Sequence, residues 1–319
     1  MKNYDYKIAV IGGGTGLASI LRGLKRLPIE ITAIVTVADD GSSSGSLRAE
    51  LDIPPPGDIR NVLVALSEAE PLVNELLQYR FEEGSGLVGH PIGNLLLAAM
   101  TKITGDFATA VQNLSAVLNV GGRILPVCNK GLCLCAEYED GQVATGESNI
   151  PNTDKKIKRV YYSDSCAALA EAVTAVKEAH LVILAPGSLY TSIIPNLLFP
   201  EMIQAVKTTQ AKFVYCCNIM SQPGETTGFT VSDHLTSIEE HVGFNFIDSV
   251  LVNDGSIKQE VRQKYLDDGA DVVEVDTEIL QQRAVEVIPS RVASYTESGE
   301  VRHNPKTVAI IIFSLLLDV

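Results

Sequence analysis

Five short apolar runs recur along the chain, and each leads through a polar turn toward a helical pattern. They are "KIAVIG", "ITAIVTVA", "HLVILA", "KFVYCCN" and "SVLVN". Continuous apolar strands that alternate with helices are typical of a mainly parallel sheet buried on both faces. The pattern therefore predicts an α/β fold. No linker separates domains, so residues 1–319 are expected to form one unit.

Two segments break this rhythm. Residues 58–119 have a helical pattern almost throughout, whereas residues 123–162 are rich in predicted strands with a hairpin turn at "EDGQ". We interpret both as excursions from the α/β core.

The turns that follow the strands are the predicted ligand site, because ligands of open α/β sheets bind beyond the carboxyl ends of the strands. Glycines in these turns let a ligand approach the backbone, and a helix N-terminus favours phosphate. Hydroxyls of Ser43, Ser44, Ser188 and Thr191 can bond phosphate or sugar oxygens. The other candidate residues of these turns are Gly12, Gly13, Gly14, Thr15, Gly16, Gly187, Tyr190, Asn218, Gln222, Glu225 and Asn253.

The first turn, "GGGTG" (12–16), matches no standard nucleotide fingerprint. Leu17 stands where G-x-G-x-x-G requires its third glycine, and no Gly-Lys-Ser/Thr follows as in a P-loop. The turn favours a phosphate, while a purely conformational role for the glycines stays open.

Asp39 and Asp40 end the second apolar run. An acidic residue at this place binds ribose hydroxyls in dinucleotide folds. Two adjacent carboxylates could also hold Mg²⁺, or one of them could cap the turn that follows.

Two further helix starts carry polar candidates. In "DIPPPGDIRN", Asp58 is the predicted N-cap, and Arg60 and Asn61 open the helix. In "GHPIGN", His90 and Asn94 lie at the mouth of another helix. A structural role for His90 is the alternative.

Composition excludes several classes. The chain has 25 basic and 39 acidic residues, a formal charge of −14, which argues against a nucleic-acid partner. The N-terminus shows no secretory signal, and "TVAIIIFSLLL" is too short to span a bilayer. This last segment predicts a buried terminal helix capped by Asn304 with Pro305 first, or a homodimer surface. The six cysteines are expected to be reduced and structural.

Taken together, "IGGGTGL", "AIVTVADDG", "LDIPPPGDIRNVLVAL", "GESNIP", "PGSLYTSIIPNLL" and "NIMSQPGETTGFT" resemble the YvcK-like family of bacterial gluconeogenesis factors. The resemblance runs from about Lys7 to the C-terminus. The family is similar in fold to CofD, the 2-phospho-L-lactate transferase.

The resemblance implies a Rossmann-like, cytoplasmic protein linked to gluconeogenic growth and cell shape. It implies binding of UDP-sugars such as UDP-N-acetylglucosamine, with no required cofactor, and a protein partner in the cell-wall machinery. The glycine turn would face the nucleotide, and Arg302 in "VRHNP" is the arginine expected to contact it. The chain departs from the family at Ser42, where glycine is expected, and at Ser46, where arginine is expected.

Three functions are compatible with this pattern. The first is a regulatory protein that binds a nucleotide sugar, which the scarcity of nucleophilic or metal motifs favours. The second is a Mg²⁺-dependent transferase acting on a nucleoside-diphosphate ester. The third is an NAD-binding protein.

Overall fold

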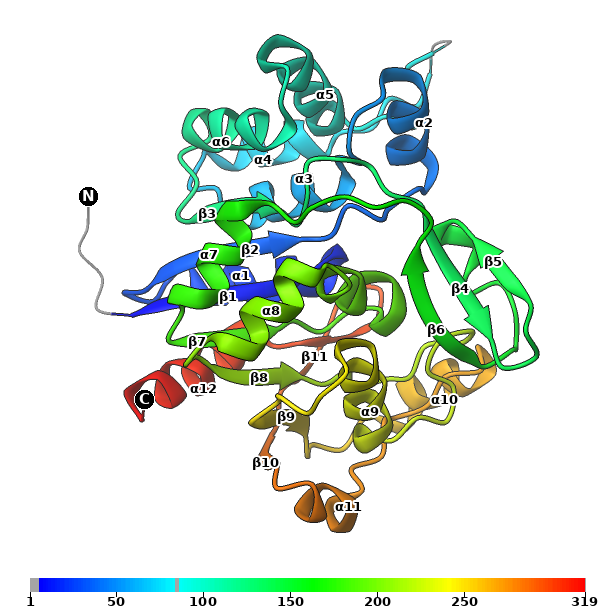
Figure 1. Ribbon diagram of the computed structural model, residues 1–319. Helices are drawn as coiled ribbons and strands as arrows, with labels where there is room; N and C mark the ends of the chain where they lie inside the picture. Colours follow the sequence, from blue (N-terminus) through cyan, green and yellow to red (C-terminus); the bar gives the residue numbers. More distant parts are fainter. Residues whose placement is uncertain (1–5, 84–85, 319) are drawn as a thin grey trace.

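The computed structural model describes residues 6–83 and 86–318, and a seven-stranded parallel sheet forms its centre (Figure 1). The N-terminal segment that was predicted to carry no secretory signal begins with residues 1–5, which lie outside the described residues. The strand order is β10-β9-β8-β7-β1-β2-β3. The strands are β1 (Lys7–Gly12), β2 (Glu30–Val35), β3 (Arg123–Pro126), β7 (Leu181–Leu184), β8 (Lys212–Cys216), β9 (Ser249–Asn253) and β10 (Glu286–Ser290).

Helices cover both faces of the sheet, as the continuous apolar runs predict. In β1, Ala9 and Ile11 belong to one buried core, while Ile8 and Val10 belong to the core on the opposite face. A strand buried on both faces has no reason to alternate with polar residues. The first core includes α7 (Ala170–Glu178), α8 (Pro200–Thr208) and α9 (Val231–Val242); the second includes α1 (Gly14–Leu24), α3 (Gly57–Leu66) and α12 (Pro305–Leu317).

The order of the strands reverses between β1 and β7. From β1 the chain adds β2 and then β3 on one side, and it later returns to place β7, β8, β9 and β10 on the other. After β1 the chain continues into a helix on one face of the sheet, whereas after β7 it continues toward helices on the opposite face. Such a switch point leaves a crevice at the carboxyl edge of the sheet, which is where doubly wound folds bind ligands.

The predicted helical segment is confirmed, and residues of α3 and of the helix over 107–117 belong to the core on one face of the sheet. Figure 1 shows its helices other than α3 stacked above β3 and β2, next to α2. They are α4 (Pro71–Gln78), α5 (Ile92–Thr104) and α6 (Phe107–Val117), whereas α2 (Ser42–Leu51) precedes the predicted segment.

The predicted β-rich excursion is wrong in one respect. Its first strand, β3, pairs with β2 and forms an edge of the central sheet. Only the rest forms a separate antiparallel sheet, which projects to one side in Figure 1. The "EDGQ" turn is confirmed, since Tyr138 N donates to Gln142 O at 2.9 Å. The small sheet consists of β4 (Leu134–Tyr138), β5 (Val143–Thr145) and β6 (Ile157–Tyr162), with a 3₁₀ turn, η1 (Glu147–Asn149), after β5.

The C-terminal part adds the helix expected after "SVLVN", together with a second helix and a hairpin that the sequence pattern does not predict. The helices are α10 (Gln259–Asp267) and α11 (Thr277–Gln282), and the hairpin joins β11 (Ala293–Tyr295) to β12 (Val301–His303).

Helix α12 begins as predicted. Asn304 accepts from Lys306 N at 3.0 Å and from Thr307 N at 3.2 Å, and Pro305 is the first helical residue. The prediction of a buried helix holds for one face only, because Ile310 is 69% exposed. Across the described residues, every helix is too short or too polar to cross a membrane. All six cysteines are unpaired, as expected.

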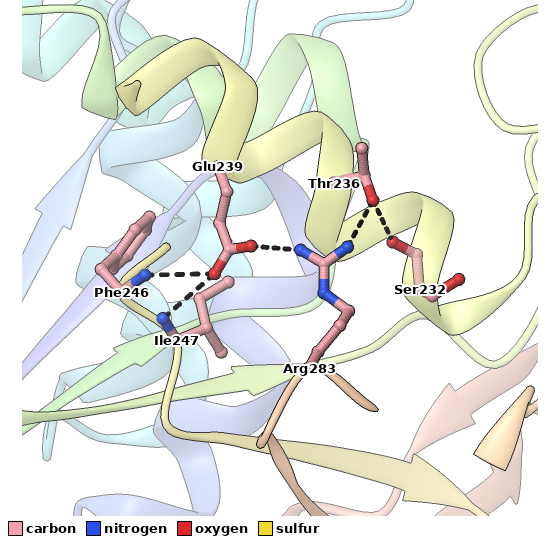
Figure 2. A network of polar contacts seen from close by, with 6 residues as sticks. All are labelled: Ser232, Thr236, Glu239, Phe246, Ile247 and Arg283. Carbon is pink, nitrogen blue, oxygen red and sulfur yellow. Dashed lines mark hydrogen bonds and ion pairs between the residues drawn. The ribbon is translucent and has the colours of Figure 1, made fainter. Parts of the chain in front are cut away.

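A buried polar network links α9 to Arg283, the residue that follows α11 (Figure 2). Arg283 pairs with the Glu239 carboxylate and donates to Thr236 Oγ1 at 2.6 Å. Glu239 also accepts from the N–H groups of Phe246 and Ile247, at 3.1 and 3.4 Å. The buried carboxylate and the guanidinium therefore neutralise one another inside the protein, which a buried charge requires.

Candidate functional site

A cavity of about 430 Å³ opens at the switch point between β1 and β7. This is within the usual range for a small-molecule site. Its walls come from five segments that are far apart in the sequence. The lining residues used below are Gly13, Gly14, Thr15, Gly16, Gly187, Ser188, Asn218, Gln222, Tyr265, Asp268, Glu300, Arg302 and His303.

The first wall is the start of α1, where the chain passes very close to the turn after β7. A Cβ built on Gly16 would lie 2.0 Å from the carbonyl oxygen of Pro186, so a side chain does not fit there. Gly14 has a φ of +61°, a conformation that glycine adopts without strain. Gly13 is the N-cap residue and leaves the helix without a side-chain cap. The N-terminus of α1 therefore presents backbone to the cavity.

The second wall is a pair of loops joined by amide side chains. Gly187 N donates to Asn218 Oδ1 at 3.0 Å, and Asn218 Nδ2 donates to Gly187 O at 2.7 Å. Gln222 Nε2 donates to Ser188 Oγ at 2.9 Å, whereas the buried Gln222 Oε1 has no partner among the described residues. Gln222 thus lines the cavity while its side-chain oxygen is buried without a partner.

The third wall is the β11–β12 hairpin, which supplies the positive charge. Arg302 pairs with Glu300 at 2.8 Å and donates to Val301 O at 3.0 Å. His303 is buried and contacts Cys217 O through Nε2 at 3.1 Å; burial lowers the pKa of His303 to about 4, so the ring is neutral at pH 7. Arg302 is therefore the positively charged side chain among the described residues that line the cavity.

The predicted site residues divide into groups. A second group, outside the lining of this cavity, surrounds the start of α2. Ser43 Oγ lies 2.8 Å from His90 Nδ1 and accepts from Asn94 Nδ2 at 3.0 Å, while Arg60 donates to Asn61 at 2.8 Å. Ser44 is buried beside them. These residues contact one another, but none of them lines the cavity that contains Arg302.

Acidic side chains lie between the two groups. Asp39 accepts from Gly41 N at 3.0 Å, in the turn-capping role left open above, and Asp40 accepts from Ser148 N at 2.8 Å. A Cβ on Gly57 would lie 2.6 Å from Asp39 Oδ2, and one on Gly146 would lie 2.6 Å from Asp40 Oδ2. The two carboxylates therefore point to different neighbours. Among the described residues, no cluster of three or more acidic, histidine or cysteine groups has the arrangement of a metal site. The predicted Mg²⁺ site at Asp39 and Asp40 stays a prediction.

Asp58 takes a role different from the predicted one. Helix α3 begins at Gly57 with Pro56 at the N-cap position, so Asp58 lies in the first turn and does not cap the helix. A Cβ on Gly13 would lie 2.6 Å from Asp58 Oδ2. Burial, and then the charge of Asp39, raise the pKa of Asp58 to about 7. Asp58 was predicted to cap its own helix, but in the structure its side chain lies beside the glycine turn.

Comparison with known proteins identifies the family. A profile described as "2-phospho-L-lactate transferase CofD" matches residues 8–293. The chain belongs to the CofD family.

Within this family the chain resembles the gluconeogenesis factors. It is 52% identical over 313 residues to the "Gluconeogenesis factor" of Bacillus subtilis, covering 98% of both chains. It is 52% identical over 303 residues to that of Halalkalibacterium halodurans, covering 95% of this chain and 94% of the relative. A crystal structure of a Bacillus halodurans protein matches with a TM-score of 0.94 at 50% identity, over 97% of this chain and 99% of that one. The family resemblance and the Rossmann-like α/β fold are confirmed.

Some predicted residues support the site of this CofD-family chain without lining its cavity. Glu225 is buried and accepts from Tyr190 N at 3.0 Å and Thr191 Oγ1 at 3.2 Å, and burial raises the pKa of Glu225 to about 7. These bonds hold the start of a π-helical turn, η2 (Leu189–Ile193), that leads into a 3₁₀ turn, η3 (Ile194–Leu197). Asn253 bonds Gly255 O at 2.6 Å and Ala293 N at 3.1 Å, which ties β9 to the hairpin. Gly12 is the last residue of β1.

Other residues escape sequence reasoning altogether. Tyr265 and Asp268 line the cavity from α10 and its end, and Tyr265 OH accepts from Val301 N at 2.9 Å. Glu147 lies near Asp39 and Asp40, and burial and these charges raise its pKa to about 8. None follows a central strand directly. The only signal for Glu147 was the "GESNIP" motif, read as a family mark and not as a site.

Proposed function

We propose that this gluconeogenesis-factor relative is a cytoplasmic regulatory protein that binds a nucleotide sugar, such as UDP-N-acetylglucosamine, in the switch-point cavity. Ligand occupancy would bias an interaction with a protein partner. The observation that carries the proposal is the position of Arg302, which lines the same cavity as the α1 N-terminus. A guanidinium and a helix N-terminus are complementary to a pyrophosphate.

Two further features support a nucleotide over a simple anion. The cavity is large enough for more than a phosphate group. Thr15, Ser188 and Gln222 add polar side chains to the cavity lining, which can bond a ribose or a sugar. Two acidic side chains, Asp268 and Glu300, also line it and can accept hydroxyl hydrogens.

The proposal is tested by a thermal-shift titration of EDTA-treated protein with UDP-N-acetylglucosamine, UDP-glucose, GDP and NAD, with and without Mg²⁺. A ligand at about 100 times its Kd stabilises by about 2.7 kcal/mol, or roughly 2–4 °C for a chain of this size. Stabilisation by UDP-sugars without Mg²⁺ is the expected result. Stabilisation by NAD instead would indicate an NAD-binding protein.

Arg302→Ala is the decisive variant. Loss of a charge-assisted bond should weaken UDP-sugar binding by about 1.5–3 kcal/mol in isothermal titration calorimetry. Arg26→Ala, an exposed arginine at the opposite end of α1, is the matched control. Equal affinities of the two variants would remove Arg302 from the site.

A Mg²⁺-dependent transferase is the second candidate. Asp39 and Asp58 favour it, because the charge of Asp39 adds to the rise in the pKa of Asp58, and a cation between the two carboxyls would relieve this repulsion. With Mg²⁺ bound there, the metal would stabilise charge on a transferred phosphoryl group. Incubation with UDP- and GDP-linked esters and Mg²⁺ or Mn²⁺ should then consume substrate, and Asp58→Asn should abolish turnover.

A further inference from the structure

The N-termini of three helices meet at the start of α2. Ser43 in α2 is bonded to Asn94 in α5 at 3.0 Å. A Cβ on Gly57, the first residue of α3, would lie 2.5 Å from Ser44 Oγ in α2, and one on Gly93 in α5 would lie 2.7 Å from Arg60 Cγ in α3. The three helices thus contact one another pairwise at their first turns.

None of these three helix ends has a side-chain cap. The N-cap residues are Gly41, Pro56 and Pro91, and no side chain bonds the first-turn N–H groups from these positions. The helices have 10, 10 and 13 residues, long enough for each N-terminus to carry partial positive charge. Three such ends together favour an anion.

Arginine side chains add full charges to this junction. Arg60 is 8% exposed, and its buried Nε has no partner. Arg80 forms an isolated β-bridge with Pro91, the N-cap residue of α5, and its exposed guanidinium donates to Gly89 O at 2.7 Å. Burial, and then the charge of Arg80, lower the pKa of Arg60. In the described part of the chain, neither arginine has a carboxylate within ion-pair distance, although Asp39 and Asp58 are the nearest acids.

The remaining side chains at the junction are polar and incompletely bonded. Asn94 is 1% exposed, and its Oδ1 has no partner among the described residues. Because amide orientation is interchangeable, this position can offer either a donor or an acceptor to a ligand. Asn61 and His90 are partly exposed and form the side through which a ligand can approach.

We infer that the junction of α2, α3 and α5 is a second ligand site, separate from the switch-point cavity, and that it binds a small phosphate monoester. Two guanidiniums and three helix N-termini suit a dianion better than a carboxylate. Arg60 is recessed within a chain of net charge −14, which disfavours a nucleic acid or an acidic protein surface. Ser43, Ser44, Arg60 and Asn94 would hold the phosphate, and the open side would admit its organic group.

Calorimetric titration of the full chain with glycerol 3-phosphate tests the inference. Inorganic phosphate is the second probe, at matched ionic strength in chloride. We expect saturable binding of the monoester, weakened about tenfold or more in Arg60→Gln. Arg26→Gln removes the same charge at an exposed site and should bind as the wild type. No binding to the wild type, or binding of inorganic phosphate only, would overturn the inference.

Two further variants make the result independent of folding and of the nucleotide cavity. Arg80 is exposed, so Arg80→Gln should fold even if circular dichroism shows that Arg60→Gln does not, and it should weaken the monoester several-fold. If Arg60→Gln folds and binds the monoester with unchanged affinity, the polar residues of the junction only hold α2 against α5. If Arg60→Gln does not fold, unchanged affinity in Arg80→Gln leads to the same conclusion. Arg302→Ala should leave monoester binding unchanged. If Arg302→Ala weakens monoester binding as much as Arg60→Gln does, the two groups of residues form a single site, and this conclusion does not depend on whether UDP-sugars bind.

Discussion

Arg283 and Arg60 occupy two regions of the molecule in which a shielded guanidinium meets different surroundings. Beside α9, Arg283 bonds the Glu239 carboxylate and the Thr236 hydroxyl, and Glu239 accepts two backbone N–H groups in addition (Figure 2). At the carboxyl edge of the sheet, Arg60 donates only to the Asn61 amide. The Nε atom lacks a partner in both, so the difference lies at the outer nitrogens.

The difference separates a closed region from an open one. A charge without a counter-charge is costly in a low-dielectric environment, and the α9 network avoids that cost within the chain itself. The edge of the sheet does not, since among the described residues Arg60 has no carboxylate within ion-pair distance, and Arg302 has one that is exposed to solvent. Incomplete pairing at the end of parallel strands is what a protein that binds anions requires. The predictions below test this contrast, from the largest expected effect to the smallest.

Glu239→Ala should break the closed region. It leaves Arg283 and the N–H groups of Phe246 and Ile247 without their acceptor, at a cost of about 3–5 kcal/mol in the free energy of unfolding. Urea denaturation measures this loss. Glu178→Ala is the matched control, because it breaks an exposed pair with Lys7 and should leave stability unchanged. Similar midpoints for the two variants would contradict the contrast.

Gly16→Ala should distort the open region. The new methyl group would lie 2.0 Å from Pro186 O, and separating the two turns should cost about 1–3 kcal/mol and widen the cavity. Thermal unfolding and UDP-sugar titration measure the two effects. Gly121→Ala is the control, since its nearest neighbour would be Glu68 Oε1 at 3.5 Å. If Gly16→Ala has the same unfolding temperature and the same UDP-sugar affinity as Gly121→Ala, the close approach of the two turns has no functional consequence.

Glu147→Gln should change how stability depends on pH. The ordinary pKa of a glutamate is near 4.5, and in the folded chain that of Glu147 is about 8. The folded state therefore retains a proton that the unfolded state has lost, and stability falls as pH rises from about 4.5 to 8. The glutamine variant removes this term and should be more stable than the wild type at pH 8 by about 1–2 kcal/mol, discounted for partial exposure.

The measurement is the unfolding free energy of both proteins at pH 5 and pH 8. Glu139→Gln, an exposed residue of the same small sheet, should follow the wild type at both values. Parallel curves for wild type and Glu147→Gln would show that Glu147 is ionised in the folded chain.

Glu300→Gln should have the smallest effect. It frees Arg302 from an exposed ion pair, and such pairs contribute little. We expect UDP-sugar affinity to rise by no more than about fivefold, with a weaker dependence on salt. Reduced affinity would show instead that Glu300 holds Arg302 in its binding position or bonds the ligand directly.

Much of the fold follows from local sequence. The apolar runs at Ile8 and Leu181 have no polar alternation, so they require helices on both faces, and the structure has them. Asn304 and Pro305 define a helix start through bonds that span only three residues. Strand β3 was misassigned because four residues carry no periodicity that distinguishes one sheet from another.

The sequence by itself determined the α/β class, the glycine-rich turns and the polar residues that follow the strands. Only the tertiary structure decided that these residues form two groups, one at Arg302 and one at Arg60, with Asp58 turned toward Gly13 between them. Burial and capping are short-range properties that periodicity encodes. Which turns meet depends on the lateral order of the strands, and β1 lies beside β7 although some 170 residues separate them. That order comes from packing over the whole sheet, so no local pattern specifies it.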